Sequence, residues 1–76
     1  MAHLNLGFRL EKKGNLDGAE EHYRRAIEID PNYAKAHYNL GNVLLRKGNL
    51  DGAEDHYHRA IEIDPEYVFA HLSLAF

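Results

Sequence analysis

The chain has 76 residues, a formal net charge of −3 and no cysteine. This length allows one small domain, and the lack of cysteine excludes disulfides and thiolate metal sites. No apolar run approaches the roughly 18 residues that a membrane span needs, so we expect no membrane partner and, by default, a cytoplasmic location. Charges of both signs are interleaved rather than gathered in a basic stripe, which argues against nucleic acid as a partner.

The first predicted elements are two helices joined by a tight turn. Apolar residues recur at helical spacing over 2–13 and stop at Gly14, which we expect in the left-handed conformation that ends many helices. The second helix is predicted over 17–30. It opens with a capping-box-like pair, Asp17 and Glu20, and ends before a proline.

The following elements repeat the first two. Helices are predicted over 34–47 and 51–64, and a fifth helix is predicted over 68–75. Residues 1–34 and 35–68 are identical at 24 of 34 positions. Self-similarity at a fixed period of this length is typical of stacked repeat arrays, in which each unit buries its apolar face against its neighbours.

Small residues are predicted where two helices of a pair approach closely. Gly7 and Gly41 lie inside the first helix of each copy, where glycine costs roughly 1 kcal/mol relative to alanine, and close packing is the expected compensation. Larger side chains are expected to fill the remaining core, namely Leu6, Leu10, Tyr23, Leu40, Leu44 and Tyr57.

This pattern resembles the tetratricopeptide repeat family, whose unit is a helix-turn-helix of the same length. The matching residues are Leu6-Gly7-Leu10, Ala19-Tyr23-Ala26 and Pro31 in the first copy, and Leu40-Gly41-Leu44, Ala53-Tyr57-Ala60 and Pro65 in the second. The resemblance implies an all-α fold, a right-handed superhelical α-solenoid of antiparallel helix pairs with about five helices. The single domain, 1–76, would contain repeat one at 1–33, repeat two at 34–67 and a partial third repeat at 68–76.

The resemblance also implies a binding site for a protein or peptide. In this family the first helices line a concave groove, so we expect a non-catalytic module that binds a peptide segment of a partner. Asn5 and Asn39 share a repeat position and resemble asparagines with which some members hold a peptide backbone, although asparagine is also simply common there. The predicted groove residues are Asn5, Phe8, Lys12, Lys35, Tyr38, Asn39, Asn42, Leu45 and Arg46, with Leu4 and Glu11 on the same face.

A structural alternative is self-assembly through the incomplete third repeat. Residues 66–76 are the most apolar stretch of the chain, and no second helix follows to cover them. An open stacking face favours association with another copy, by stacking or by exchange of the terminal helix, so we expect a homo-oligomer. The near-identity of the copies also suggests a recent duplication, a designed chain or one excised from a longer array. The predicted contact residues are Val68, Phe69, Leu72, Leu74 and Phe76.

Other functions find little support in the sequence. There is no glycine-rich phosphate loop, and Ser73, the only serine, points away from His71 on a helix, so we predict no enzyme and no cofactor. Of the six histidines, three recur with the repeat and would stack as a column, while His56 and His58 diverge on a helix; we therefore predict packing and no metal site. Of the five positions with which some relatives clamp chaperone tails, only Asn39 matches.

Overall fold

The structure, a computed structural model, describes residues 2–67 of the chain. Four α-helices make up most of this part. They are α1 (Ala2–Lys12), α2 (Leu16–Ile29), α3 (Ala34–Arg46) and α4 (Leu50–Ile63), and a helical turn at 65–67 follows them. The predicted fifth helix, 68–75, lies outside the described residues. So do the predicted self-association residues, Val68, Phe69, Leu72, Leu74 and Phe76.

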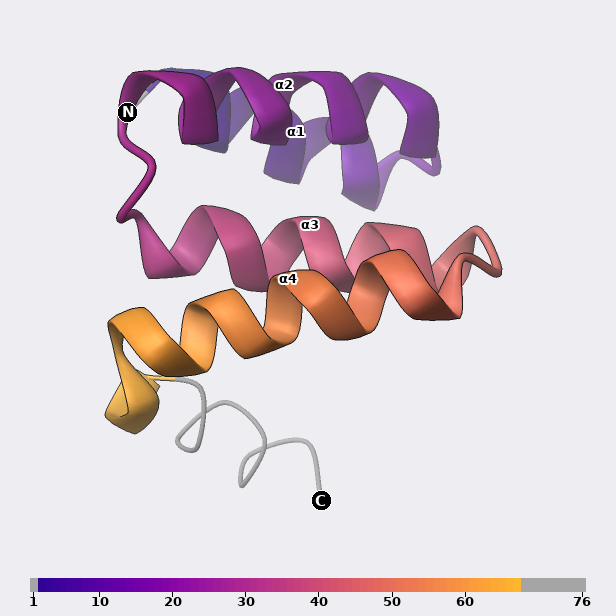
Figure 1. Ribbon diagram of the computed structural model, residues 1–76. Helices are drawn as coiled ribbons and strands as arrows, with labels where there is room; N and C mark the ends of the chain where they lie inside the picture. Colours follow the sequence, from indigo (N-terminus) through magenta and orange to yellow (C-terminus); the bar gives the residue numbers. More distant parts are fainter. Residues whose placement is uncertain (1, 68–76) are drawn as a thin grey trace.

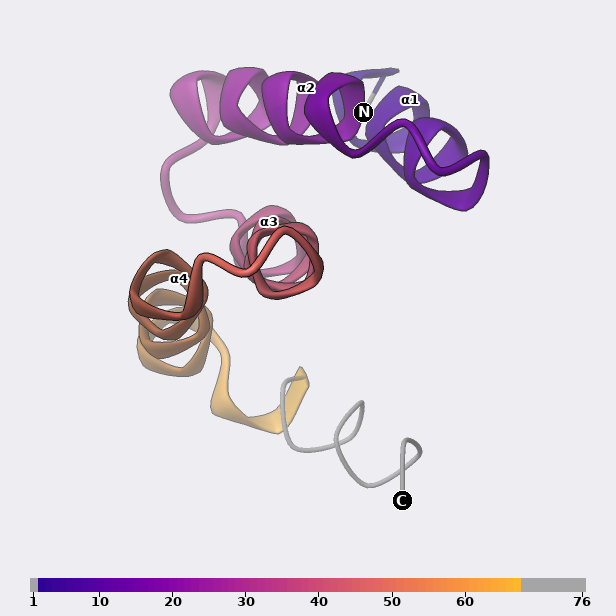
Figure 2. The same cartoon turned by 90° about the vertical axis from the view of Figure 1, so that its right-hand side faces the viewer.

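The helices form two antiparallel pairs, α1 with α2 and α3 with α4, and α2 packs against α3 to join the pairs (Figure 1). Seen along α3 and α4, the first helices α1 and α3 lie on one side and the second helices α2 and α4 on the other (Figure 2). This arrangement confirms the predicted all-α solenoid of helix pairs.

Each pair is closed by a three-residue turn whose glycine is left-handed, as predicted. The φ angle is 86° at Gly14 and 87° at Gly48. In the first turn the Asn15 N–H donates to the Leu10 carbonyl and the Gly14 N–H to the Glu11 carbonyl, and the same two bonds recur in the second turn. These bonds satisfy carbonyls at the end of the helix. A Cβ at either glycine would meet no atom within 4 Å, so backbone conformation rather than space requires glycine.

The second helices begin one residue earlier than predicted, and asparagine rather than aspartate caps them. The Asn15 side-chain oxygen accepts a hydrogen bond from the Gly18 N–H at 3.0 Å, and Asn49 caps α4 in the same way. The predicted capping by Asp17 is wrong, because Asp17 already lies inside the first turn of α2. A carboxylate there still faces the positive end of the helix dipole.

Glycines within the first helices let tyrosine rings lie directly on the helix backbone. A Cβ added at Gly7 would be 2.6 Å from Cε1 of Tyr23, and one at Gly41 would be 2.8 Å from Cδ1 of Tyr57. Such contacts are too short for any side chain, so the close approach predicted at both glycines is confirmed. The core built around these contacts contains Leu4, Ala19, Tyr23, Ala26, Ala36, Leu40, Val43, Leu44 and Ala53.

Leu6 and Leu40 occupy the same repeat position but differ in burial. Leu40 is 0% exposed on α3, where it lies beside Ile27 of α2. Leu6 is 44% exposed on α1, because no helix within the described residues covers that face of α1. The prediction of Leu6 as a core residue is therefore wrong: this position is buried only where a preceding second helix packs on it.

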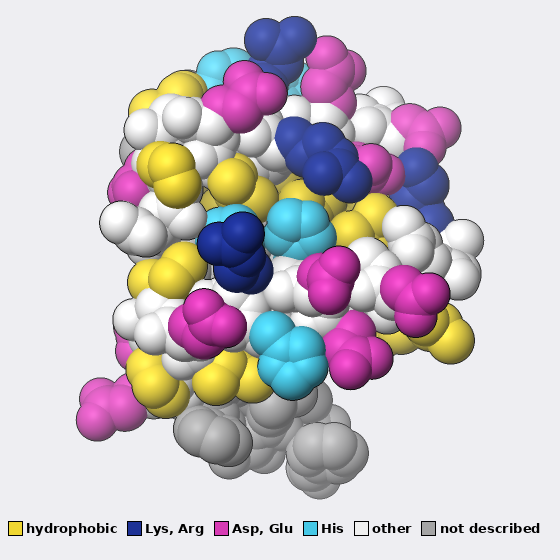
Figure 3. Space-filling model, in the orientation of Figure 1, with side chains coloured by type: hydrophobic (Ala, Val, Ile, Leu, Met, Phe, Trp, Pro, Cys, Tyr) yellow, Lys and Arg dark blue, Asp and Glu magenta, His cyan; other side chains and the backbone are white. Residues whose placement is uncertain are grey.

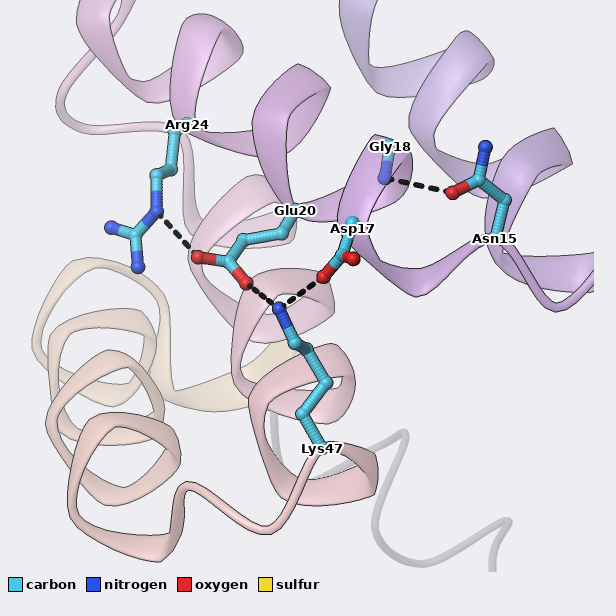
Figure 4. A network of polar contacts seen from close by, with 6 residues as sticks. All are labelled: Asn15, Asp17, Gly18, Glu20, Arg24 and Lys47. Atoms are coloured by element: carbon cyan, nitrogen blue, oxygen red, sulfur yellow. Dashed lines mark hydrogen bonds and ion pairs between the residues drawn. The ribbon is translucent and has the colours of Figure 1, made fainter.

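A lysine clamp, formed by Lys47, Asp17 and Glu20, joins the two helix pairs. Nζ of Lys47, in the turn after α3, lies 2.6 Å from Oδ1 of Asp17 and 2.7 Å from Oε1 of Glu20, both on α2 (Figure 4). The other oxygen of Glu20 accepts a hydrogen bond from Arg24. The hydrogen bonds from Lys47 are the main reason that the pKa values of both carboxyls are lowered.

The first prediction concerns the small residues of the second helices. Ala26 and Ala60 are fully buried. Ala26→Leu and Ala60→Leu should each lower the free energy of unfolding by about 1–3 kcal/mol through overpacking. Lys35→Ala, at an exposed position, should change it by less than about 0.5 kcal/mol. Thermal and urea denaturation measure these changes. Equal losses at Ala60 and Lys35 would contradict the assignment of faces.

The second prediction uses a matched pair of lysines. Lys13 has the repeat position of Lys47, but no carboxylate within residues 2–67 binds it. Lys47→Ala should therefore lower the urea midpoint more than Lys13→Ala does. The difference should shrink at high salt, which screens exposed charges. Identical midpoints for the two variants at low salt would show that the lysine clamp does not stabilise the contact between the pairs.

Candidate functional site

A groove with a volume of about 440 Å³ lies between α1, α3 and the helical turn at 65–67. Such a volume falls within the range of roughly 300–1,000 Å³ that is usual for ligand sites. The groove is lined by Leu4, Asn5, Phe8, Lys35, Tyr38, Asn39, Asn42 and Tyr67.

Most of the predicted groove residues meet here, but three do not. Lys12 lies on α1 with Nζ 4.8 Å from the ring centroid of Phe8. Leu45 is 48% exposed on α3, and Nη1 of Arg46 lies 3.5 Å from the carboxylate of Glu11. All three sit near the ends of their helices, beyond the groove. The predicted residues that line it are Asn5, Phe8, Lys35, Tyr38, Asn39 and Asn42.

Sequence reasoning missed Tyr67 as a groove residue. The helical turn that carries it starts at Pro65, a favoured first helical residue, and Oδ1 of Asp64 accepts a hydrogen bond from the Tyr67 N–H at 3.2 Å. Its repeat counterpart, Tyr33, packs partly buried against the core just before α3. That repeat position, directly before a first helix, was the signal that could have found Tyr67. Leu4, predicted on the same face, is almost fully buried and forms part of the groove floor.

The asparagines of the groove differ in whether their side-chain amides already form hydrogen bonds within the protein. Asn39 is only 9% exposed, yet within residues 2–67 its side chain has no hydrogen-bond partner. Because no side-chain nitrogen or oxygen of the described residues is both fully buried and unpaired, the Asn39 amide must still reach the groove. Asn5 is exposed at the α1 side, whereas the oxygen of Asn42 accepts a hydrogen bond from the Tyr57 hydroxyl.

The bond between Asn42 and Tyr57 replaces a different one in the first pair. Tyr23, the counterpart of Tyr57, donates to a carboxylate oxygen of Glu11 at 2.8 Å. The second copy has Leu45 where the first has Glu11, so its tyrosine needs another acceptor and finds it in Asn42. Burial is the first cause of the raised pKa of both tyrosines, which keeps these hydroxyls protonated donors.

Aromatic rings form one wall of the groove. The ring centroid of Tyr38 lies 5.7 Å from that of Tyr57 and 5.9 Å from that of Tyr67, the second contact being edge to face. Edge-to-face pairs at such distances are favourable for aromatic rings. The wall is therefore held in place by the protein itself and offers apolar surface to a ligand.

Charge is distributed unevenly between the two layers of helices. α1 holds two basic residues and one acidic residue, and α3 two basic residues and no acidic one. α2 holds four acidic and two basic residues, and α4 four acidic and one basic. The predicted interleaving of charges is seen on the outer face, with α2 and α4 in front (Figure 3). Among the described residues that line the groove, Lys35 is the one that carries a charge.

Each helix pair also contains a stacked histidine pair. The Nδ1 atoms lie 3.2 Å apart in His3–His22 and 3.1 Å apart in His37–His56, with ring centroids 5.4 Å apart in both. Nε2 of His37 lies 2.9 Å from the Pro31 carbonyl, which can only accept, so this nitrogen donates. In neutral His37 the Nδ1 atom is then the acceptor, and His56 donates to it. The histidines of the described residues thus pair within each repeat. The predicted column includes His71, which lies outside the described residues.

Within the described part of the chain, the paired rings do not belong to a larger ligand set. Among residues 2–67 no group of three or more histidine, cysteine, aspartate or glutamate side chains is placed to hold a metal ion. In the same part of the chain no helix is long and apolar enough to cross a membrane.

Two family profiles match the chain. A TPR repeat profile matches residues 7–48, and a tetratricopeptide repeat profile matches residues 34–67. The chain therefore belongs to the tetratricopeptide repeat family. Repeats of this family are in general non-catalytic modules of protein–protein interaction. No curated protein gives a significant match to the chain.

The third prediction concerns the histidine pair of α3 and α4. Burial, followed by the charges of His37 and Arg24, lowers the pKa of His56 from 6.5. The unfolded chain then binds a proton at His56 more readily than the folded one, so the free energy of unfolding should fall as pH drops below 6.5. Urea denaturation at about pH 7.5 and about pH 5.5 measures this fall, which His56→Gln should reduce.

The control for this experiment is His58→Gln, because His58 lies on the same helix with an exposed side chain. It should leave the loss of stability between the two pH values as in the unmodified chain. The same reduction in both variants would mean that acidification acts through something other than the histidine pair.

Proposed function

We propose that this chain is a non-catalytic binding module that holds a peptide segment of a partner protein in the groove. The observation that carries the proposal is Asn39, a residue only 9% exposed whose side-chain amide reaches the groove and has no partner within residues 2–67. Because this amide is still open to the groove, a peptide group of a ligand can form a hydrogen bond with it in place of water. An enzyme would need groups that convert a substrate, and the described residues that line the groove include no such set.

The chemistry of the groove suits a peptide backbone with one or two apolar side chains. An asparagine amide can donate to a peptide carbonyl and accept from a peptide N–H, so Asn39 and Asn5 can address the backbone of a ligand from α3 and α1. Apolar side chains would lie against Phe8 and the ring of Tyr38. These contacts contribute through burial of apolar area, at about 25 cal/mol per Å².

Charge favours a particular kind of peptide. Lys35 adds a positive charge to a groove to which residues 2–67 contribute no carboxylate, and the nearby Glu11 already pairs with Tyr23 and Arg46. A peptide with an acidic side chain next to its apolar anchor would therefore meet a complementary charge. Such complementarity acts mainly on specificity and on the rate of association.

The fourth prediction tests the asparagine contact. A peptide selected from a library against the chain should lose about 1–3 kcal/mol of binding free energy with Asn39→Ala, because its paired backbone group is left unsatisfied. Calorimetric titration or fluorescence anisotropy measures the loss. Asn32→Ala is the matched control, since Asn32 is exposed and lies outside the groove.

Two results would contradict the proposal at different levels. A selected peptide whose affinity is indifferent to Asn5→Ala combined with Asn39→Ala would remove the role given to the asparagines. Failure of a diverse library to yield any peptide whose binding is weakened by Tyr38→Ala or Asn39→Ala would overturn the groove as the binding site.

A further inference from the structure

A second hollow adjoins the groove at the end of the molecule where α2 leads into α3 and α4 leads into the helical turn at 65–67 (Figure 1). Its volume is about 450 Å³, close to that of the groove. Tyr33, directly before α3, and Ile63, the last residue of α4, line it and are both partly buried. Asn32 also lines it but is exposed, so its amide can keep its hydrogen bonds with water. The tyrosine ring and the isoleucine offer apolar surface to one side chain of a ligand.

Two residues line both the groove and the hollow. They are Lys35, in the first turn of α3, and Tyr67, in the helical turn. The ring of Tyr67 also contacts that of Tyr38, a groove residue, edge to face with centroids 5.9 Å apart. The groove and the hollow are therefore neighbours with a shared wall. A ligand that extends from the groove past Tyr67 enters the hollow.

Lys35 provides a positive charge where the groove and the hollow meet. It is exposed, and no carboxylate within residues 2–67 forms an ion pair with it. Asp64 lines the same hollow, but its Oδ1 accepts a hydrogen bond from the Tyr67 N–H. An acidic side chain of a ligand would thus meet a cation that has no carboxylate partner in the described part of the chain. Because an exposed ion pair adds little affinity, this contact fixes the register of the ligand more than its strength.

We propose that one continuous peptide segment of the partner occupies the groove and the hollow, with an acidic residue between two apolar ones. The first apolar side chain lies in the groove against Phe8 and Tyr38. The acidic side chain pairs with Lys35. The second apolar side chain enters the hollow against Tyr33 and Ile63. This inference rests on the proposed function of the groove, and it adds a second anchor and a fixed order of side chains.

The geometry of an extended peptide suits three anchors in a row. Successive side chains of an extended chain point to opposite sides, so every second one faces the same surface, about 7 Å further along. We therefore expect the order apolar, any residue, acidic, any residue, apolar. The backbone between the anchors keeps its N–H and carbonyl groups, which the amides of Asn5 and Asn39 can pair in the groove.

Selection of short random peptides displayed on phage against the unmodified chain tests this order. The selected peptides should share an acidic residue with an apolar residue on each side. The tightest of them is then synthesised, and its dissociation constant is measured by calorimetric titration. Alanine in place of the second apolar residue should raise that constant about tenfold, because the peptide loses one buried side chain. This measurement uses the unmodified chain, so it does not depend on whether any protein variant folds.

Ile63→Ala locates the second anchor in the hollow. It should also raise the dissociation constant about tenfold, and the peptide with alanine at its second apolar position should bind Ile63→Ala no more weakly than the selected peptide does. The two changes delete the same contact, so their effects should not add. Ile29→Ala is the matched control, because Ile29 has the repeat position of Ile63 but is 65% exposed and lines neither the groove nor the hollow. Thermal denaturation shows whether each variant is folded.

A reversal of charge tests the middle of the order. Lys35→Glu, at an exposed position, should raise the dissociation constant of the selected peptide about fivefold. A peptide with lysine in place of its acidic residue should bind Lys35→Glu more tightly than it binds the unmodified chain, since the pair is restored with its signs exchanged. Weakening of both peptides to the same extent would contradict the pairing with Lys35.

The possible failures separate this inference from the proposed function. Peptides whose binding needs Tyr38 and Asn39, but neither their own second apolar residue nor Ile63, would overturn the second anchor and leave the groove as a peptide site. Peptides that need Ile63 but are indifferent to Tyr38→Ala and Asn39→Ala would make the hollow a separate site, against both proposals. A library that yields no peptide sensitive to any of these three substitutions would also overturn both.

Discussion

The packing of a tyrosine ring on a glycine backbone is the contact on which the rest of this structure depends. Tyr23 over Gly7 and Tyr57 over Gly41 set how closely the first and second helix of each pair approach. Because the ring lies where a Cβ would be, the distance between the helices has no freedom to drift. Both copies therefore have the same pair geometry, and the contact between pairs can repeat with the same residues.

The periodic features of the fold could be predicted from the sequence, whereas those that depend on a neighbour could not. The turn glycines and the helix pairs follow from local pattern, since Gly14 and Gly48 need a left-handed backbone wherever the repeat occurs. Leu6 shows the limit of this reasoning. It matches Leu40 in type and position, yet it is exposed because burial at that position comes from the preceding second helix. The lysine clamp could not be predicted from the pattern of one repeat either, because Lys47 lies in the second repeat and Asp17 and Glu20 lie in the first.

Only part of the site could be predicted from the sequence. The two copies share the asparagines of the groove but differ in the other residues that line it. Asn5 and Asn39 are the same in both copies, while Leu4 is replaced by Tyr38 and Phe8 by Asn42. Each copy thus surrounds a constant amide with different side chains, so the two ends of the groove are chemically distinct. The sequence could place these residues on one face, but not show that the Asn39 amide is unpaired. It also could not show that Asn42 serves Tyr57, since that depends on side-chain geometry.

The groove lies on a face of α1 different from the one that carries Leu6. Asn5 and Phe8 line the groove, whereas Leu6 lies on the face that corresponds to the α2-covered face of α3. A peptide held by Asn5 and Phe8 would therefore leave Leu6 untouched, and its binding would not depend on whether that face of α1 is covered.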